Sequence, residues 1–412
     1  MNAENQTVNA EDQAMHTETD ASSNWSGGVR FTPAATLHPS NEADVAAAVV
    51  RARSERRHVR VVGSGHSFVP FWQDNDLVLH LDNLQGLIDV DAAAGEAEFF
   101  AGTKLHALGE PLWEAGFALA NMGDIDRQAL AGAISTATHG TGPGLTNLSA
   151  MVTELSLVDG HGTLQRLSQR EQLDGAAAAF GSLGILTRIR MKVLPRYGLL
   201  ERQWMAAPSD CMAQLDALQA RTRHFEFFYL PGQDICLCKS LEAVAAPADH
   251  GPVAELAFGV DGERTGASFR IFPSQRDAKF NEMEFSVPAD DGPACFEALC
   301  VLLRRDFPRI AWPIEYRTVA ADGLWLSPHS GRASVTISLH QAAEREHEPF
   351  FRAAEAILLR HAGRPHWGKL HFMGSNELAD RYPQWHRFQA LRNQFDPDRV
   401  FSNGYIRHLL GP

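Results

Sequence analysis

Three glycine-rich stretches in the first half of the sequence have residue types suited to chemistry. The first, residues 61–68, reads Val-Val-Gly-Ser-Gly-His-Ser-Phe and follows a run of strand-forming residues. Glycines let the backbone approach a ligand closely, and successive amides in such a turn form a concavity that binds phosphate oxygens. The stretch begins like a GxGxxG dinucleotide fingerprint, but the third glycine is missing and a second strand follows where a helix is required. A Rossmann-type fold is therefore excluded.

Two further stretches extend this pattern. Residues 121–142 are dense in Gly, Ser and Thr, as suits a segment that hydrogen-bonds a buried, extended polar ligand through amides and hydroxyls. Residues 181–185, Gly-Ser-Leu-Gly-Ile, form a small-residue turn that leads into a strand. Taken alone, the three stretches are either tight turns or the contacts of one elongated ligand.

Charged residues of the second half are candidates for acid–base and electrostatic work. Glu315 and Arg317 flank Tyr316 in a strand-like run, and the period of two places both on one face. They form either a plain salt bridge or a pair that points into a cleft. Lys369, in the sequence His-Trp-Gly-Lys, is either a surface lysine lying along Trp367 or a fixed cation beside a reacting atom.

Composition limits the class of protein. A chain of 412 residues with 44% hydrophobic and 21% charged residues predicts two globular domains. A net charge of -13 without a basic cluster argues against nucleic-acid binding, and no apolar run approaches the roughly 20 residues that span a bilayer. Five cysteines without a CxxC pair indicate buried thiols in a reducing compartment. We therefore expect a cytoplasmic protein with neither a nucleic-acid nor a membrane partner.

The order of predicted elements favours an α+β protein. Residues 1–24 are polar and acidic, which predicts a disordered tail and not a signal peptide. A domain boundary is expected at residues 195–198. Before it we expect helices beginning at Asn41 and near residue 105, strands at 58–62, 76–81, 96–101 and 185–193, and a hairpin of 152–158 with 163–167. After it we expect strands at 225–230, 280–287, 314–319 and 334–339, with helices at 293–307 and 346–361.

The motifs together resemble a known family. GSGHSF at 63–68, LAGAISTATHGTG at 130–142 and GSLGI at 181–185 are similar to the FAD-binding domain of the vanillyl-alcohol oxidase type, in its aldonolactone oxidase and alditol oxidase branch. PHWGK at 365–369 and the stretch 395–403 match the same branch, whereas 201–308 match only in outline. The resemblance implies a two-part PCMH-type FAD-binding domain at 25–197, an α+β substrate-binding cap at 198–365, and a segment 366–412 that returns to the active site.

The resemblance also implies residue roles. His66 carries over as the histidine bonded covalently to the flavin, while His139 carries over as a phosphate-side or packing histidine. Glu315, Arg317 and Lys369 are the implied catalytic residues, and no metal is expected. The implied FAD-binding residues are Val62, Gly63, Ser64, Gly65, His66, Ser67, Gly123, Asp124, Ala129, Gly132, Ala133, Ser135, Thr136, His139, Gly184 and Ile185.

The implied reaction is removal of a hydride from a C–OH carbon by FAD, followed by reduction of dioxygen to hydrogen peroxide. Gly123 matches a position that gates oxygen access, where glycine favours an oxidase. The alternatives are a flavin dehydrogenase that uses a quinone or cytochrome, and a flavin- or sugar-binding protein without turnover. The resemblance also leads us to expect that Asp124, Ser338 and His340 bind the substrate. Alditol oxidases differ here, because they carry a serine in place of Asp124, and a His and a Thr on the strand that holds Ser338 and His340 in this chain. Aldono-1,4-lactones, alditols and free sugars therefore all remain open as substrates.

Overall fold

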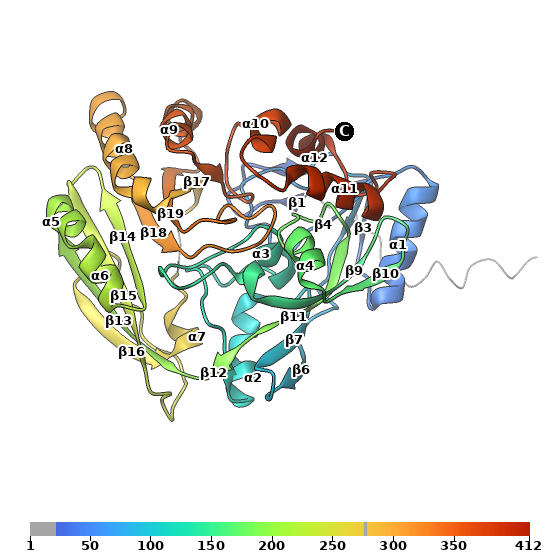
Figure 1. The fold of residues 1–412 in the computed structure, drawn as a ribbon, viewed down its shortest axis with the longest axis horizontal. Helices are drawn as coiled ribbons and strands as arrows, with labels where there is room; N and C mark the ends of the chain where they lie inside the picture. Colours follow the sequence, from blue (N-terminus) through green and yellow to red (C-terminus); the bar gives the residue numbers. More distant parts are fainter. Residues whose placement is uncertain (1–21, 276–277) are drawn as a thin grey trace, which may run out of the picture.

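Two sheet-containing parts face each other in the computed structural model, which describes residues 22–275 and 278–412 (Figure 1). The first part runs to residue 197 and contains a parallel and an antiparallel sheet. The second contains one eight-stranded antiparallel sheet with helices on its outer side. Helices and strands mix without a regular alternation, which confirms the predicted α+β class.

The described chain starts earlier than the sequence predicted. The disorder predicted for residues 1–21 concerns residues outside the described ones. For residues 22–24 the prediction of a disordered tail was wrong. Ser22–Ser23 (β1) pairs with Arg30–Phe31 (β2), and the side chain of Asn24 accepts a hydrogen bond from the Val29 amide at 3.0 Å. Asn24 is buried although it is polar, because its side chain takes part in such local hydrogen bonds.

A three-stranded parallel sheet carries the first glycine-rich loop. Its order is β3-β5-β4, formed by Ala35–Leu37 (β3), Val59–Val61 (β4) and Leu77–Leu79 (β5). Helix α1, Glu42–Ser54, packs beside it and begins as predicted, because Asn41 Oδ1 accepts a hydrogen bond from the Asp44 amide at 2.9 Å. β4 passes through residues 62–76 directly to its parallel neighbour β5 without a helix, which confirms that this is no Rossmann unit.

A five-stranded antiparallel sheet completes the first part, in the order β10-β9-β11-β7-β6. The predicted hairpin of β9 and β10 is confirmed, with Leu164 opposite Val158. The single helix expected near residue 105 is instead a 3₁₀ turn, Leu105–Ala107, followed by a short helix in which Pro111 occupies the first turn. The remaining elements are Leu87–Asp91 (β6), Glu96–Phe100 (β7), Gly109–Glu114 (α2), Phe117–Ala118 (β8), Leu130–Ser135 (α3), the 3₁₀ turn Leu148–Met151, Val152–Val158 (β9), Leu164–Leu167 (β10), Arg170–Ala176 (α4), Ile185–Lys192 (β11) and Leu194–Pro195 (β12).

The eight-stranded sheet of the second part has the order β16-β13-β15-β14-β18-β19-β17-β20. Its strands are Gly198–Ala206 (β13), His224–Leu230 (β14), Ile235–Val244 (β15), Gly262–Ala267 (β16), Phe280–Pro288 (β17), Ile314–Val319 (β18), Ser334–Ala342 (β19) and Arg364–Pro365 (β20). Its helices are Pro208–Ala213 (α5), Leu215–Arg221 (α6), Ser268–Ile271 (α7), Gly292–Asp306 (α8) and Glu348–Arg360 (α9), with a 3₁₀ turn at Ala289–Asp291. All predicted strands and helices of this region are present, but β13, β15 and β16 were not predicted.

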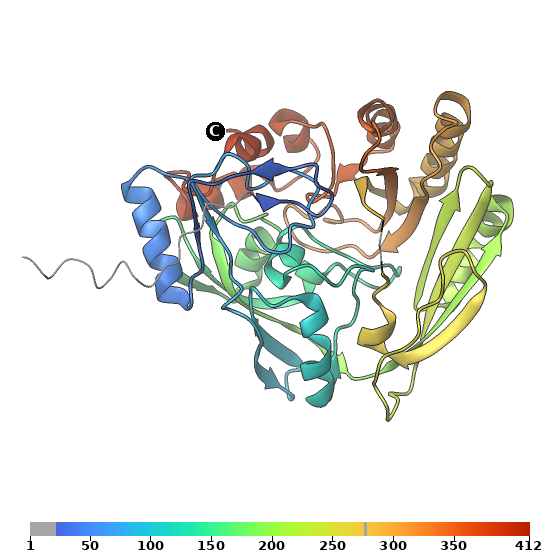
Figure 2. The same ribbon diagram turned by 180° about the vertical axis from the view of Figure 1, so that it is seen from behind.

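Helices α5, α6, α8 and α9 lie on the outer side of this sheet, and the first part lies on the other side (Figures 1 and 2). Phe227 and Tyr316 stack on each other, and both contact the Phe296 ring of α8 edge to face, so their strand faces form the apolar core. Because side chains alternate along a strand, the neighbours of these aromatic residues point toward the first part. The inner face of the sheet is therefore where functional side chains are expected.

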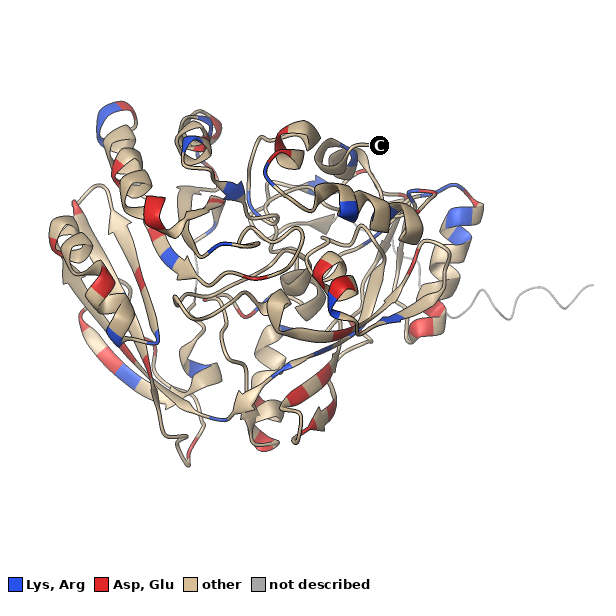
Figure 3. Cartoon of the chain, viewed as in Figure 1, with Lys and Arg blue, Asp and Glu red and all other residues tan. Residues whose placement is uncertain are grey.

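The C-terminal segment returns to the first part. Ser375–Ala379 (α10), Trp385–Phe395 (α11) and Gly404–Leu410 (α12) pack beside the parallel sheet (Figure 1). The Val59 amide donates to Val400 O at 2.9 Å, and Asn403 Nδ2 donates to Phe71 O at 2.9 Å. Positive and negative side chains are interspersed over the described chain (Figure 3). Among the described helices, none combines the length and apolarity required to cross a membrane.

Candidate active site

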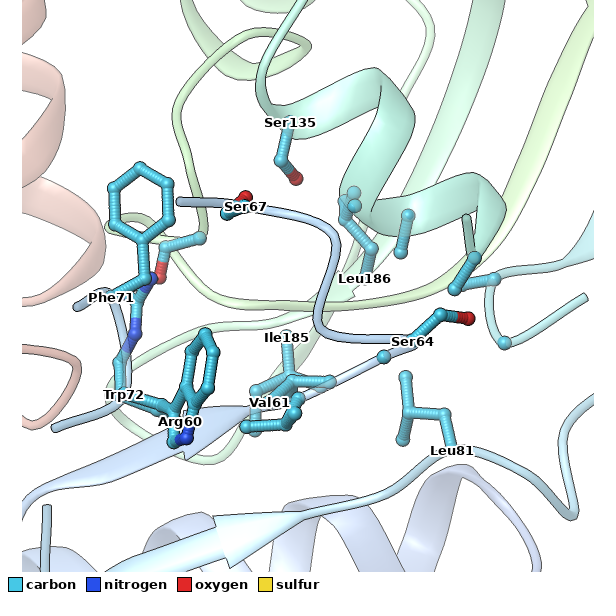
Figure 4. A pocket seen from close by; sticks show the side chains of 18 of the residues that line it. Arg60, Val61, Ser64, Ser67, Phe71, Trp72, Leu81, Ser135, Ile185 and Leu186 are labelled. Atoms are coloured by element: carbon cyan, nitrogen blue, oxygen red, sulfur yellow. The ribbon is translucent and has the colours of Figure 1, made fainter. Parts of the chain in front are cut away.

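A cavity of about 1080 Å³ lies where the three glycine-rich stretches meet (Figure 4). Ser64 and Ser67 come from the loop after β4, Ser135 from α3, and Ile185 from the start of β11. Most of the predicted cofactor residues line it: Val62, Gly63, Ser64, Gly65, His66, Ser67, Ala129, Gly132, Ser135, Thr136, Gly184 and Ile185. The stretches that are separate in sequence thus enclose one space.

Backbone geometry in this cavity suits a large polar ligand. Gly65 has φ +66°, and a Cβ at Gly63 would come within 2.9 Å of Ala129 Cβ. A Cβ at Gly132 would meet no described atom within 4 Å, so the helix backbone directly borders open space. Trp72 also lines the cavity, and its buried Nε1–H has no hydrogen-bond partner among the described residues. A narrow space bounded by bare backbone and unused donors fits a dinucleotide such as FAD.

Arg60 fixes the floor of this cavity. Its buried guanidinium donates to Phe180 O at 2.6 Å, Gly181 O at 3.0 Å and Phe401 O at 3.2 Å. Burial lowers the pKa of Arg60 to about 10, with Asp396 opposing that shift. The guanidinium remains charged at neutral pH and joins the third glycine-rich turn to the C-terminal segment.

Four predicted cofactor residues do not line this cavity. Gly123, Asp124 and His139 line a second cavity instead, and Ala133 is fully buried inside α3. His139 was expected on the phosphate side or as a packing histidine; its ring lies 2.8 Å from Glu284 of the eight-stranded sheet and is not among the described residues that line the first cavity. Gly123, Asp124 and His139 are close in sequence to residues of the first cavity, but the segments before and after α3 that carry them border the second cavity.

The second cavity, about 1170 Å³, lies against the inner face of the eight-stranded sheet. Gln128 lines both cavities, whereas His66 lines the first cavity and a third, outer one of about 1630 Å³. Lys369 and Glu282 line the second and the outer cavity. Gln128 therefore stands at the junction between the first and the second cavity, and His66 at the junction between the first cavity and the outer one.

Strand register assembles the charged side chains of the second cavity. On β17 and β19, Glu282 is opposite His340 and Glu284 is opposite Ser338. Ser338 is also opposite Glu315 of β18. Acidic, basic and hydroxyl side chains from three neighbouring strands thus meet on one face.

Glu284 is the most heavily hydrogen-bonded group in this cavity. It accepts hydrogen bonds from Arg317 Nη2, from Ser338 Oγ at 2.6 Å and from His139 Nε2 at 2.8 Å. Burial alone would raise the pKa of Glu284, but the charges of His139 and Arg317 hold it well below its usual value. His139 Nδ1 lies 2.8 Å from Gly140 O, which can only accept. The two ring nitrogens of His139 thus face the Gly140 carbonyl on one side and the Glu284 carboxylate on the other, which fixes the orientation of the buried imidazole.

The Glu-Arg pair predicted from sequence is only part of this network. Arg317 Nε lies 3.3 Å from Glu315 Oε1, while its Nη2 binds Glu284. Burial raises the pKa of Glu315 to about 8, although Arg317 acts in the opposite direction. Glu284 is thus the main anionic partner of Arg317, and the Glu315 carboxyl is largely protonated at neutral pH.

Lys369 has an anionic partner that the sequence did not reveal. Its ammonium binds Glu282 and lies 4.9 Å from the centre of the Phe68 ring. Burial would raise the pKa of Glu282, but Lys369 and His340 hold it below its usual value. Lys369 is therefore held in place by Glu282, whose carboxylate balances its charge.

Two expected substrate residues have different positions. His340 lines the second cavity, and its Nδ1 lies 2.9 Å from Pro313 O. Ser338 is fully buried, and its hydroxyl is used by Glu284, so it is not among the described residues that line the cavity. This position does not agree with its predicted role as a substrate contact. The register of β19 against β17 places Ser338 opposite Glu284, and its hydroxyl donates to that carboxylate.

Sequence reasoning missed several cavity residues: Glu282, Glu284, His366 and Gln128. For two of them a signal was present. In residues 280–287, Glu282 and Glu284 alternate with Met283 and Phe285, which gives a strand with one charged and one apolar face. The whole strand from residue 280 to 287 is buried, both glutamates included. Paired carboxylates on a buried strand indicate a site.

The cluster of His139, Glu284 and His366 brings two imidazoles and a carboxylate within metal-ligand range. Its hydrogen bonds do not suit a metal. The Gly368 amide donates to His366 Nδ1 at 3.1 Å, and burial lowers the pKa of His366 to about 3, so the neutral ring has its proton on Nε2. Glu284 already accepts three hydrogen bonds. The cluster is better described as a hydrogen-bonded network beside the cavity.

Comparisons with known proteins agree with this geometry. A model described as FAD binding domain matches residues 33–168, and one described as D-arabinono-1,4-lactone oxidase matches residues 252–409. The chain is therefore an FAD-dependent oxidoreductase with a PCMH-type FAD-binding domain. It is 34% identical to L-gulono-1,4-lactone dehydrogenase of Mycobacterium tuberculosis, over 95% of this chain and 99% of the relative. The chain belongs to the aldonolactone oxidase and alditol oxidase branch of these flavoproteins.

More distant relatives extend the likeness. Alditol oxidase of a Streptomyces species is 27% identical over 95% of this chain and 99% of its own length. L-gulonolactone oxidase of Mus musculus is 23% identical over 94% and 97%. A crystal structure of cholesterol oxidase from B. sterolicum has a TM-score of 0.84 at 17% identity, with 99% of both chains covered. That last likeness shows the fold alone.

Proposed function

We propose that the chain is an FAD-dependent oxidase that oxidises a C–OH carbon of a sugar-derived substrate, an aldono-1,4-lactone, an alditol or a sugar, and reduces dioxygen to hydrogen peroxide. The observation that carries this proposal is that a dinucleotide-sized cavity adjoins a charged cavity, with Gln128 lining both. Bound FAD supplies two-electron oxidation, which no side chain can provide. The relatives named above act on sugar lactones or alditols according to their names.

The chain's own residues bind the substrate and move its proton. Removing a hydrogen from a C–OH carbon also requires loss of the hydroxyl proton, and a carboxyl with a pKa near the working pH is suited to accept it. Glu315, whose pKa is about 8, is our proposed acceptor in its ionised form. Lys369 and Arg317 provide positive charge where the substrate oxygen becomes more negative.

We also propose that FAD is bonded covalently through His66. The reaction needs a neutral imidazole with a free ring nitrogen, and burial together with Lys369 lowers the pKa of His66 to about 4. Its ring stacks on Trp25 at a centroid distance of 5.9 Å, which fixes its orientation. The test is acid precipitation: the yellow colour should remain in the pellet, and His66→Ala should release it into the supernatant. Colour released from the unmodified protein would refute the bond.

The electron acceptor has a specific rival. The relative with 34% identity is named a dehydrogenase, whereas others are named oxidases. Gly123 lines the second cavity without a side chain, which supports oxygen access, although a Cβ there would also come within 3.0 Å of His139 O. Packing is thus a second reason for this glycine. Gly123→Ala tests both: slower reoxidation in air at unchanged thermal stability supports oxygen gating.

The function itself is tested by anaerobic mixing with lactones, alditols and aldoses, followed by air. Bleaching of the flavin by one of these compounds, then stoichiometric peroxide on aeration, supports the oxidase. Bleaching that persists in air but reverses with a quinone or cytochrome supports the dehydrogenase. No bleaching by any of the three classes would refute the proposed substrate class.

A further inference from the structure

A buried ion cluster lies next to the second cavity. Lys239 of β15 has only 7% of its side chain exposed, and its Nζ lies 3.0 Å from Asp124 Oδ1 and 3.0 Å from Glu226 Oε1. Burial would lower the pKa of Lys239, but Asp124 and Glu226 raise it, so the amine stays charged. Asp124 lines the cavity, whereas Lys239 lies behind it.

Folding alone is a poor reason for this cluster. Removing an ammonium and carboxylates from water costs several kcal/mol per ion, and well-packed apolar residues are often as stable. The other side of β15 shows such packing, with Cys236 and Cys238 buried. The cluster occurs on the one sheet face that borders the cavity, which points to a role there.

Lys239 controls both the charge and the direction of Asp124. The ammonium takes one carboxylate oxygen, and Ser274 Oγ donates to the other at 3.3 Å. Asp124 lines the cavity, where the hydroxyl groups of a bound substrate can reach its carboxylate. Glu226 and Glu315 have oxygens within 4.8 Å of Asp124. Without the cation between them, these acids would repel one another and Asp124 would protonate or turn away.

We propose that Lys239 is a specificity-determining residue, which holds Asp124 as an oriented anion that accepts hydrogen bonds from the hydroxyl groups of a neutral polyhydroxylated substrate. The proposal rests on the function proposed above. A substrate carboxylate next to this anion would be repelled, so lactones and polyols should bind better than open-chain sugar acids.

The experiment measures kcat/KM of the holoenzyme for its best substrate, for the monodeoxy analogues of that substrate, and for the open-chain acid of the corresponding lactone. Lys239→Met should lower kcat/KM for the parent substrate by roughly 10- to 100-fold, mainly through KM, and leave at least one deoxy analogue nearly unchanged. Lys239→Arg, which keeps the charge, should restore most of the loss. Equal losses on parent and all analogues would overturn the proposal.

A double variant separates positioning from independent action. If Lys239 acts through Asp124, Lys239→Met combined with Asp124→Asn should discriminate between substrates no worse than Asp124→Asn alone. The double variant also removes one buried charge of each sign, so it serves if Lys239→Met does not fold. Losses that multiply would contradict the proposal.

A matched control is Arg190→Met, which breaks an ion pair with Glu98 on the antiparallel sheet of the first part. It should lower stability without changing the ratio of kcat/KM between substrates.

Calorimetry of the binding of the parent lactone to the anaerobic holoenzyme gives a readout that does not depend on turnover. If no sugar-derived compound is oxidised but lactone binding still depends on Lys239, the proposed function fails and the recognition role stands.

Discussion

The two inner cavities are built by opposite means. The dinucleotide-sized cavity is bounded by backbone, small side chains and hydroxyls, and its shape depends on where no side chain is present. The second cavity is bounded by charged side chains on adjacent strands, and its properties depend on pairing between them. One cavity therefore recognises its ligand mainly by space and amide donors, whereas the other does so by charge balance. Substitutions should affect the two in different ways.

The largest expected effect is on cofactor content. Gly132→Leu adds a side chain where a Cβ meets no described atom, so the chain should fold but the side chain should occupy cofactor space. We expect flavin content to fall by more than tenfold, measured by absorbance per protein. Gly232→Leu is the matched control, since a Cβ there also meets nothing within 4 Å but the position is outside the cavities. Normal flavin content in Gly132→Leu would break the proposed division between the cavities.

Removing the central carboxylate should have the next largest effect, and on a different property. Glu284→Gln leaves the buried Arg317 guanidinium without its main anion and His139 without its carboxylate partner, which costs roughly 3–5 kcal/mol for a buried pair. We expect a clearly lower midpoint of thermal unfolding and a loss of activity of 100-fold or more, with flavin still bound. A stable, active variant would show that charge balance is not what organises the second cavity.

The sequence predicted the first cavity better than the second for a physical reason. Its walls are continuous segments such as 61–68 and 181–185, where glycines and their spacing record the ligand contact directly. The second cavity depends on strand register, which places Glu284 beside Ser338 and Arg317 although these residues are far apart in sequence. Glu315 and Arg317 were predicted because they share a strand, and their true partner was missed because it does not.

Titration of Glu315 gives a smaller and pH-dependent effect. Its pKa is raised to about 8, so the carboxyl is mostly neutral at pH 7 and ionises as the pH rises to 9. If the ionised form accepts the substrate proton, kcat/KM should rise roughly tenfold per pH unit below about pH 8 and level off above it. In Glu315→Gln this rise should disappear. A profile that keeps the same inflection in the variant would assign it to another group.

The smallest expected effect distinguishes structural support from substrate contact. Ser338 was predicted to touch substrate, but its hydroxyl donates to Glu284 at 2.6 Å and is fully buried. Ser338→Ala should therefore remove one hydrogen bond to a charged group, worth roughly 1.5–3 kcal/mol, and lower activity by about the same factor on every substrate. His340→Ala, at a cavity-lining position, should instead change the ratio between lactones, alditols and sugars. A substrate-dependent loss in Ser338→Ala would mean that the hydroxyl leaves Glu284 and reaches the ligand.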